Sequence, residues 1–407
     1  MSSVGPSIPA RSQVSGRGLG VAAVHAAYVL AAFIALVWAL FTIEWGVDWG
    51  VIGFDFRGTL WDPALAIREG RTPYPSPTSG ELESGNPALY PPFLMFVVMP
   101  LTVLPWSAGV VVWTILLGGA IAAALYVLGV RDVRCYALAL VAQFSVFGLI
   151  FGNATLLLVP LVALAWRWRE RWVRVGVVVG LAIAAKLFLW PLLFWLLGTR
   201  RYRAFGAGVV ACLVALFLPW ALIGFDGLRA YPDLLRAAED LYAAHGYSFA
   251  AILNALGTDI ATASKVTLAL GGALAAAAFL VGRRRADSAA VSLAVLAAVL
   301  GSPIVWPYYY ALLLVPLAIV RPNFSGWWVA LTLFYASNVL TRDLLTEEEL
   351  AAESICCRPA DVPFVIWSVN HSPPALWHAS VYAVVGAALV AFAVWTAQRS
   401  KVTSEAA

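Results

Sequence analysis

A single carboxylate lies in apolar sequence soon after the first long hydrophobic run of this chain. Asp55 lies between Phe54 and Phe56, about a dozen residues past that run. Apolar surroundings raise the pKa of a carboxyl group, and such a carboxylate can take the proton of a hydroxyl. The alternative is that Asp55 caps a loop helix or pairs with Arg57. The local sequence leaves both interpretations open.

A second ionisable residue lies inside a hydrophobic segment. Lys186 belongs to the apolar stretch "AAKLFLWPLLFWLL". A lysine is expensive within hydrocarbon and by default indicates a function, here the compensation of a lipid-linked phosphate. The alternative is that its ammonium group snorkels to an interface, which its central position makes less easy.

Two amides and one loop histidine are further candidates for substrate binding. Gln143 and Asn153 lie in "AQFSVFGLIFGNATLLLVP", where their amides could bind sugar hydroxyls or hold helices together. His245 lies in "AAHGYSFAAILNALG" and could hold a phosphate or a hydroxyl. A lone histidine in a loop is also often simply exposed, so each residue keeps a structural alternative.

Aromatic residues open a late hydrophobic segment. The stretch "GSPIVWPYYYALLLVP" contains Trp306, Tyr308 and Tyr309. Aromatic faces stacked on a sugar would explain these residues. An aromatic belt at the membrane interface would explain them equally well.

The charges that follow Asp55 have simpler explanations. Asp62 precedes Pro63, which fits an N-cap with proline at the first helical position. Arg68 and Glu69 fit the solvated face of that helix, and Gly70 would end it. We therefore expect a short helix in the loop after Asp55.

The elements that must position these residues are membrane helices. The chain has 407 residues, of which 62% are hydrophobic and 12% charged, against about 25% charged in soluble domains. Apolar runs of membrane-spanning length recur along it, which predicts an all-α polytopic membrane protein of about 11–13 transmembrane or re-entrant helices. The predicted spans cover residues 20–43, 107–130, 135–150, 152–167, 173–197, 204–224, 263–282, 288–302, 303–320, 326–341 and 376–397.

Basic residues cluster in the short connections between these spans, which the positive-inside rule assigns to the cytoplasm. The clusters are Arg131/Arg134, Arg167 to Arg174, Arg200/Arg201/Arg203, Arg283 to Arg285, Arg321 and Arg399/Lys401. No basic face on a soluble domain is present, so a nucleic-acid partner is not expected. The predicted organisation is a flexible cytoplasmic tail at 1–19, one integral membrane domain at 20–397, and a cytoplasmic tail at 398–407. Outer segments are expected at about 44–106, 225–262, 302–308 and 342–375.

Two segments need a special topology. Residues 89–106 have a short apolar middle between prolines, which predicts a re-entrant or interfacial helix. Residues 173–201 have basic clusters at both ends and Lys186 in the middle. A tight hairpin of two short helices would keep both ends on the cytoplasmic side. Irregular backbone at that depth must be buried in protein or reached by water.

The order of these pieces resembles glycosyltransferase family 87, a membrane family that includes polyprenol-phosphate-mannose-dependent mannosyltransferases. The resemblance runs over about residues 20–320. The matching pieces, in order, are "DFRGTLWDPALAIREGRTPYP", "LYPPFLMFVVMPL", "GNATLLLVPLVALAW", "AAKLFLWPLLFWLL", "YSFAAIL" and "SPIVWPYYYALLLVP".

The resemblance implies a fold and a reaction. It implies a bundle of the GT-C superfamily in the plasma membrane, with a site that faces the periplasmic or extracellular side. The enzyme would invert the anomeric centre as it moves a sugar, with mannose expected, from a polyprenyl phosphate to a glycolipid or cell-envelope polysaccharide. Asp55 matches the family's catalytic aspartate. Lys186 would supply a cation for the phosphate, with Arg57 as the second candidate. No cofactor and no metal are expected.

One departure from the family pattern concerns the late motif. The family commonly continues from tryptophan into aspartate and paired histidines, whereas here Pro307, Tyr308 and Tyr309 follow Trp306. A histidine role cannot be carried over to this place. Either a tyrosine binds phosphate or sugar differently, or the donor or the function has changed.

Three other functions remain compatible with the sequence. A transporter or flippase of lipid-linked sugars would explain the helices and Lys186, but it explains the aromatic outer loop with Asp55 less well. An arabinofuranosyltransferase would use the same type of donor. A non-catalytic partner in envelope assembly would fit the altered tyrosine motif. Cleavage of the donor separates the enzymes from the other two.

Overall fold

The computed structural model describes residues 16–79, 82, 86–338 and 376–405. Within these ranges the chain forms helices joined by loops, without strands. Five helices there are long and apolar enough to cross a membrane. They are α1 (Gly16–Asp48), α5 (Trp106–Val127), α11 (Tyr202–Leu222), α14 (Ile260–Arg283) and α20 (Leu376–Glu405). The predicted all-α polytopic membrane protein is confirmed.

The predicted span 135–150 is broken. It consists of α6 (Val133–Val141) and α7 (Gln143–Phe151), which are bent by 61° at Ala142. Ala142 has an extended backbone, with φ −59° and ψ 138°, so the helical hydrogen bonds cannot continue through it. The prediction of one continuous helix was therefore wrong, although the pair together can count as a sixth span.

Several other predicted spans are covered by helices too short to cross a membrane alone. These are α8 (Thr155–Arg167), α9 (Trp172–Ala185), α10 (Pro191–Gly198), α15 (Asp287–Leu300), and the pair η5 (Pro307–Leu313) and α16 (Leu314–Val320). A helix of 14 residues is about 21 Å long, against about 30 Å of hydrocarbon. Their broken ends are tolerated because protein surrounds them: α15 and η5 are almost entirely buried.

The segment 173–201 reverses its direction at Lys186, as its sequence predicted. The backbone of Lys186 is extended, with φ −148° and ψ 114°, between α9 and the 3₁₀ turn η4 (Leu187–Leu189). The two ends of the segment come together again, because Arg201 Nη2 lies 2.7 Å from Glu170 Oε1 and 2.9 Å from Asp287 Oδ2. α9 packs along α11 and α10 along α14, which anchors both arms of the reversal.

The loop after α1 is largely helical. α2 (Phe54–Phe56), the π-helical turn η1 (Arg57–Trp61) and α3 (Asp62–Arg68) follow one another without interruption. The predicted N-cap at Asp62 was therefore wrong, because the preceding residue Trp61 is already helical. The Asp62 carboxylate instead lies 3.5 Å from Arg57 Nε. Gly70 does end the helix: it has φ +71°, and the N–H of Arg71 donates to the Ala66 carbonyl at 2.8 Å.

The predicted tails and late segments end at different residues from those expected. α1 begins at Gly16, inside the predicted tail 1–19, and α20 continues to Glu405, inside the predicted tail 398–407. In place of the predicted span 326–341 there are α17 (Gly326–Val329) and the 3₁₀ helix η6 (Ala330–Asn338). The predicted outer loop 342–375 lies outside the described residues.

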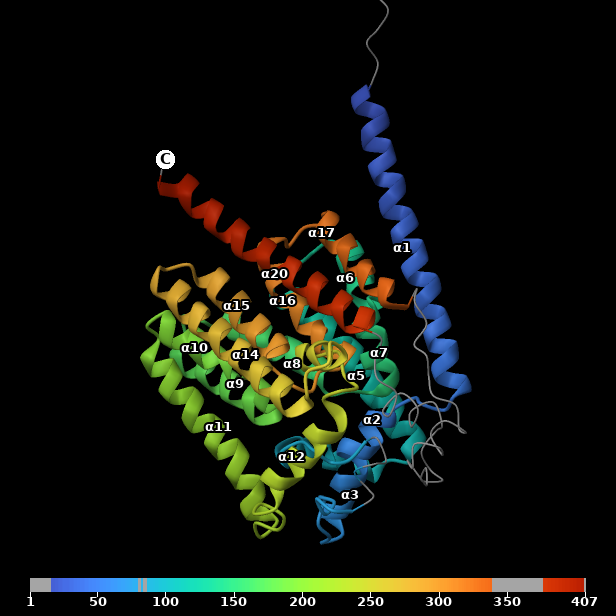
Figure 1. The fold of residues 1–407 in the computed structure, drawn as a ribbon, viewed down its shortest axis with the longest axis vertical. Coiled ribbons are helices and arrows are strands. Elements are labelled where there is room, and N and C mark those ends of the chain that lie inside the picture. Colours follow the sequence, from blue (N-terminus) through green and yellow to red (C-terminus); the bar gives the residue numbers. More distant parts are fainter. Residues whose placement is uncertain (1–15, 80–81, 83–85, 339–375, 406–407) are drawn as a thin grey trace, which may run out of the picture.

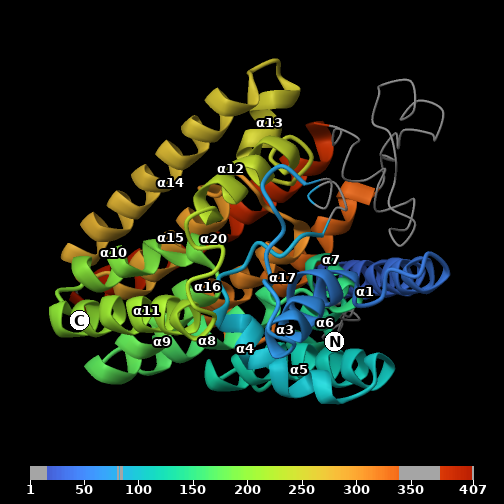
Figure 2. The same ribbon diagram turned by 90° about the horizontal axis from the view of Figure 1, so that it is seen from below.

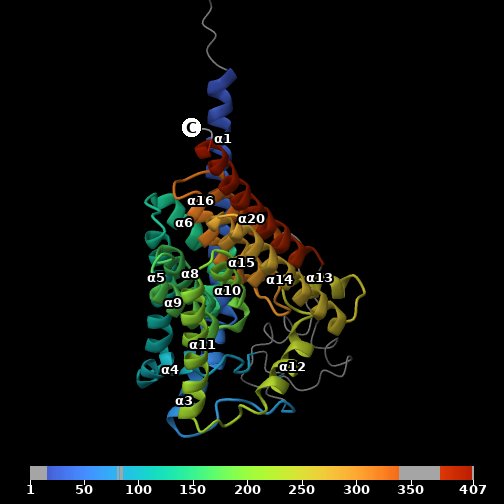
Figure 3. The same cartoon turned by 90° about the vertical axis from the view of Figure 1, so that its left-hand side faces the viewer.

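The molecule has two different ends (Figure 1). α2, α3 and α12 (Tyr231–Tyr242) lie at one end, whereas the N-terminus of α1 and the C-terminus of α20 lie at the other. Seen from below, α1 and the group α9 to α11 occupy opposite sides of the bundle (Figure 2). Figure 3 shows α3 and α12 projecting at the same end, with α4 (Phe93–Val98) beside α3. The site lies between these helices and the ends of the short ones.

Candidate functional site

A cavity of about 1380 Å³ opens where the short helices stop. Asn153 precedes α8, Lys186 follows α9, Gly301 follows α15, and Pro307 begins η5; all four residues line the cavity. The ends of these short helices therefore form part of the cavity wall. One wall is apolar and comes from α1, through Phe33, Ile34, Val37, Trp38, Phe41, Thr42 and Trp45.

Asp55 lies at the wall of the cavity, half-buried at the start of the loop helix. Its carboxylate Oδ2 accepts a hydrogen bond from Asn153 Nδ2 at 2.7 Å. The Tyr308 hydroxyl also interacts with this carboxylate. The backbone is held from below, where Thr59 Oγ1 donates to the Asp55 carbonyl at 2.6 Å and the Asn86 amide donates to the Phe54 carbonyl.

The Asn153 side chain connects Asp55 with Lys186 through hydrogen bonds. Its Oδ1 accepts three hydrogen bonds, from the Thr155 N–H at 2.9 Å, the Thr155 hydroxyl at 2.7 Å, and Lys186 Nζ at 3.2 Å. Because the amide oxygen is used in this way, Nδ2 must point toward Asp55 and toward the Tyr90 hydroxyl, 3.2 Å away. One amide thus orders a carboxylate and an ammonium group.

Two glycines allow the loop helix to approach Asn153. Gly53 and Gly152 have φ values of +71° and +70°, which side chains rarely permit. The Gly53 N–H donates to the Ile150 carbonyl at 2.7 Å. A Cβ on Gly152 would lie 2.8 Å from Phe56 Cβ and 3.3 Å from Gly53 Cα. Any side chain there would push Asp55 away from its amide partner.

Lys186 is enclosed by hydrogen-bond acceptors and aromatic rings. It is 3% exposed, and its Nζ donates to Thr155 Oγ1 at 2.7 Å. Nζ also lies 4.6 Å from the ring centre of Tyr90, 4.3 Å from that of Tyr309 and 5.8 Å from that of Tyr308. Such rings stabilise a cation. An ammonium has three N–H groups, and Thr155 and Asn153 use two of them, so a third remains for an oxygen of a ligand.

The electrostatic environment suits Asp55 for accepting a proton. Burial raises the pKa of the Asp55 carboxyl above its ordinary value, while Asn153, Tyr308 and the Lys186 charge act in the opposite direction. Burial is the largest of these effects. A carboxylate with a raised pKa binds a proton more readily than an exposed one, as a general base must.

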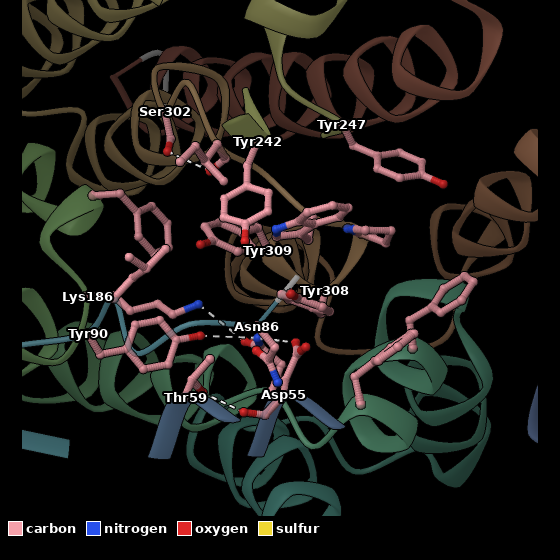
Figure 4. A pocket seen from close by; sticks show the side chains of 18 of the residues that line it. Asp55, Thr59, Asn86, Tyr90, Lys186, Tyr242, Tyr247, Ser302, Tyr308 and Tyr309 are labelled. Atoms are coloured by element: carbon pink, nitrogen blue, oxygen red, sulfur yellow. Dashed lines mark hydrogen bonds between the residues drawn. The ribbon is translucent and has the colours of Figure 1, made fainter. Parts of the chain in front are cut away.

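Six of the nine predicted site residues line the cavity. They are Asp55, Asn153, Lys186, Trp306, Tyr308 and Tyr309. Figure 4 shows Asp55, Tyr90 and Lys186 on one side of this space, with Tyr242 and Ser302 across from them. The six residues come from four separate stretches of the chain, so the fold itself assembles the site.

The other three predicted residues do not line it. Arg57 is exposed beside Asp62 and 5.6 Å from the Trp106 ring centre, because two residues along a helix turn it about 200° away from Asp55. Gln143 is buried between α7 and η6, where its Oε1 accepts from Ser337 Oγ at 3.1 Å. His245 Nδ1 lies 2.9 Å from the Leu241 carbonyl oxygen. Gln143 thus fits the alternative of an amide that holds helices together, whereas Arg57 pairs with Asp62 rather than with Asp55, and His245 is half-buried rather than exposed.

Four residues that sequence reasoning did not propose also line the cavity or hold its groups. Tyr90, Asn86 and Glu239 are lining residues, and Thr155 bonds both Asn153 and Lys186. A signal was present for two of them. Tyr90 belongs to the quoted "LYPP" stretch, and Thr155 follows Asn153 at the spacing at which an asparagine side chain bonds the backbone two residues on. For Asn86 and Glu239 no local pattern was available.

The fold and the site define a polytopic helical membrane protein with a half-buried carboxylate beside a buried amide and a buried ammonium at one end of its bundle. Residues 88–307 match glycosyltransferase family 87, and the chain belongs to this family. The matched part contains Tyr90, Asn153 and Lys186, while Asp55 precedes it. The resemblance inferred from the short motifs is confirmed.

One curated relative adds a more particular comparison. Over 285 residues the chain is 29% identical to the polyprenol-phosphate-mannose-dependent alpha-(1-2)-phosphatidylinositol pentamannoside mannosyltransferase of Mycolicibacterium smegmatis. The match covers 61% of this chain and 66% of that protein, so the chain spans just under two thirds of its relative's length. No solved structure matches.

Proposed function

We propose that this protein transfers a sugar, mannose in the first instance, from a polyprenyl-phosphate donor to a hydroxyl of a glycolipid or cell-envelope polysaccharide. Family membership supports glycosyl transfer, and the name of the relative supports the donor. The observation that carries the proposal is the Asp55–Asn153–Lys186 arrangement within one cavity. It combines a proton acceptor with a cation, the two groups that transfer from a sugar phosphate needs.

In the proposed reaction Asp55 is the base. Its carboxylate takes the proton of the acceptor hydroxyl while that oxygen forms a bond to the anomeric carbon. The bond between this carbon and the phosphate oxygen breaks on the opposite face, and polyprenyl phosphate leaves with the bonding electrons. The anomeric configuration inverts. The hydrogen bond from Asn153 supports the role because it fixes the direction of the carboxylate.

Lys186 is proposed to stabilise the leaving phosphate. Its ammonium group is held by Thr155 and Asn153 and by the Tyr90 and Tyr309 rings, so it is ordered before the donor arrives. A preorganised cation in a site shielded from water favours the charge that develops in the transition state. Tyr308 and Tyr309, which replace the family's usual histidines, act here through Lys186 and Asp55.

The apolar wall of the cavity suits the lipid part of the donor. Phe33, Ile34 and Phe41 of α1 line the cavity and are exposed. A cavity wall made of exposed apolar side chains supports a lateral opening toward the bilayer. An isoprenoid chain could lie along this wall while its phosphate reaches Lys186.

We further propose that the site works on the outer face of the plasma membrane. The connections that carry Arg200, Arg201 and Arg203 and then Arg283 to Arg285 meet at the cluster formed by Glu170, Arg201 and Asp287. These connections lie away from α2, α3 and α12 (Figure 1). If the basic connections are cytoplasmic, the cavity faces outward.

The test uses the purified protein with polyprenyl-phosphomannose, with and without a phosphatidylinositol mannoside as acceptor. We expect polyprenyl phosphate and a mannosylated acceptor to form in equal amounts. Movement of the donor across a vesicle bilayer without cleavage would overturn the proposal in favour of a flippase, and no reaction of either kind would favour a non-catalytic partner. The same assay with polyprenyl-phosphoarabinofuranose decides the sugar.

A further inference from the structure

The helix α12 covers the cavity from the outer end and presents two different faces. Leu235, Ala238, Glu239 and Tyr242 line the cavity. The opposite face is exposed and carries Pro232, Asp233, Arg236 and Asp240. α12 is therefore a wall of the site as well as part of an outer loop.

Hydrogen bonds hold both ends of α12 against the segment that carries Asn86 and Tyr90. At its start, the Tyr231 hydroxyl donates to the Leu89 carbonyl at 2.8 Å. At its end, the Tyr242 hydroxyl donates to the Leu82 carbonyl. The rings of Tyr74, Trp220 and Tyr231 pack against one another beneath it, with centroids 4.9 to 5.5 Å apart. The position of α12 relative to Tyr90 is thus well defined.

Glu239 is the remaining charged residue among those that line the cavity. The other two, Asp55 and Lys186, are joined through Asn153. Glu239 is half-buried, and within the described ranges its carboxylate makes neither a hydrogen bond nor an ion pair. A carboxylate that faces a substrate cavity without a protein partner is available for a ligand.

The charge of Glu239 indicates which ligand. A carboxylate repels the phosphate of the donor, which has its own cation in Lys186. Carboxylates accept hydrogen bonds at both oxygens, so they suit neutral groups with adjacent hydroxyls. Tyr242, one turn further along α12, offers an aromatic face on the same wall, and it lies across the cavity from Asp55 (Figure 4).

We propose that Glu239 and Tyr242 form the acceptor subsite, which binds the hydroxyls of the sugar headgroup that receives the transferred residue. This proposal rests on the proposed function, because only a transferase has an acceptor. The donor phosphate lies at Lys186 and the acceptor sugar lies between α12 and Asp55.

The test compares Glu239→Ala and Glu239→Gln with Asp240→Asn as the matched control, because Asp240 is the neighbouring acid on the exposed face of α12. Initial rates are measured with polyprenyl-phosphomannose and a phosphatidylinositol mannoside, each varied in turn. A lost hydrogen bond to a charged group corresponds to about a tenfold or larger change in affinity. We expect Glu239→Ala to raise the acceptor KM by about that factor, Glu239→Gln to raise it less, and the donor KM to stay the same. Asp240→Asn should behave as the unmodified protein.

Each other outcome has a distinct meaning. If the unmodified protein transfers mannose but Glu239→Ala leaves the acceptor KM unchanged, the subsite is wrong and the proposed function stands. If Glu239→Ala lowers kcat alone, the residue takes part in the reaction and the subsite is also wrong. If the unmodified protein does not transfer, both proposals fail. The yield of monodisperse protein and its Tm show that the variants fold.

Discussion

The Asn153 amide donates a hydrogen bond to the Asp55 carboxylate, with 2.7 Å between Nδ2 and Oδ2, although 98 residues separate the two along the chain. The oxygen of the same amide accepts from Lys186 Nζ at 3.2 Å. The negative and positive groups of the site are therefore kept apart and oriented by one neutral side chain. A direct ion pair would have neutralised both groups, and neither would then be available to a substrate.

Replacement of Asp55 by asparagine should abolish transfer. A positioned general base contributes roughly 10²- to 10⁴-fold in rate, and asparagine cannot take the proton although it can still accept from Asn153. Release of polyprenyl phosphate measures the loss. Asp62→Asn is the control, because Asp62 is exposed and its ion pair with Arg57 is worth little. Full activity of Asp55→Asn would remove Asp55 as the base.

The pH dependence should follow Asp55. Because burial raises the pKa of this carboxyl, kcat/KM should fall as the pH is lowered through a value above that of an ordinary aspartate. The same raised pKa has the opposite effect on folding stability: activity is lost as the pH falls, whereas stability is lost as the pH rises. A folded-state pKa above the unfolded one contributes stability that is present below the unfolded pKa and is lost as pH rises through the folded pKa.

Asp55→Asn should therefore become more stable relative to the unmodified protein as the pH rises across this window. The Tm of both proteins, measured in the same detergent at several pH values, checks this. A Tm difference that stays constant or shrinks with rising pH would contradict the shifted pKa.

Removal of the Thr155 hydroxyl should lower both the stability of the protein and its rate of transfer. Thr155 is fully buried and bonds both Asn153 Oδ1 and Lys186 Nζ. Thr155→Val leaves both atoms without this partner, which costs about 1–3 kcal/mol of stability. We expect a drop in kcat of about tenfold with it, because the ammonium is no longer held. Thr155→Ser keeps the hydroxyl and should retain most of the rate; equal losses in both variants would mean that the methyl group matters instead.

A methyl group on Gly152 should separate Asp55 from Asn153. Gly152→Ala combines an unfavourable φ of +70° with a contact of 2.8 Å to Phe56 Cβ. Gly50→Ala is the matched control, because Gly50 has φ +64° with nothing within 4 Å. The control should lose about 1–2 kcal/mol from backbone strain alone. Gly152→Ala should lose more stability and most of its transfer activity, measured by thermal unfolding and by donor cleavage. Similar effects of the two changes would argue against the close approach.

Much of the site could be predicted because its residues violate the local pattern. Asp55 and Lys186 are charged residues in apolar sequence. Because placing a charged side chain in apolar surroundings costs free energy, such residues indicate a function in any fold. For Tyr308 and Tyr309 the sequence left two interpretations open, because tyrosines at a membrane interface need no ligand. Thr155 and Glu239 were missed because a threonine near a helix start and a glutamate in a polar loop are ordinary there.

Arg57 and Gln143 do not line the cavity, for reasons that lie outside their local sequence. Arg57 was the second candidate for the cation after Lys186, and Gln143 resembles Asn153 in residue type and apolar surroundings. Arg57 faces solvent because of its angular position on the helix, and Gln143 bonds Ser337, which is 194 residues away. Neither the helix phase nor the distant partner can be read from the surrounding residues.

The sequence by itself determined the class of this protein, the approximate membrane segments and the reversal at Lys186. These depend on hydropathy and on local backbone preferences, which act over a few turns of helix. Only the tertiary structure decided that Asp55, Asn153 and Lys186 share one cavity, and that short helices rather than full spans surround it. The reason is physical: hydrogen bonds and burial between segments about a hundred residues apart depend on how the helices pack, and packing is a property of the whole chain.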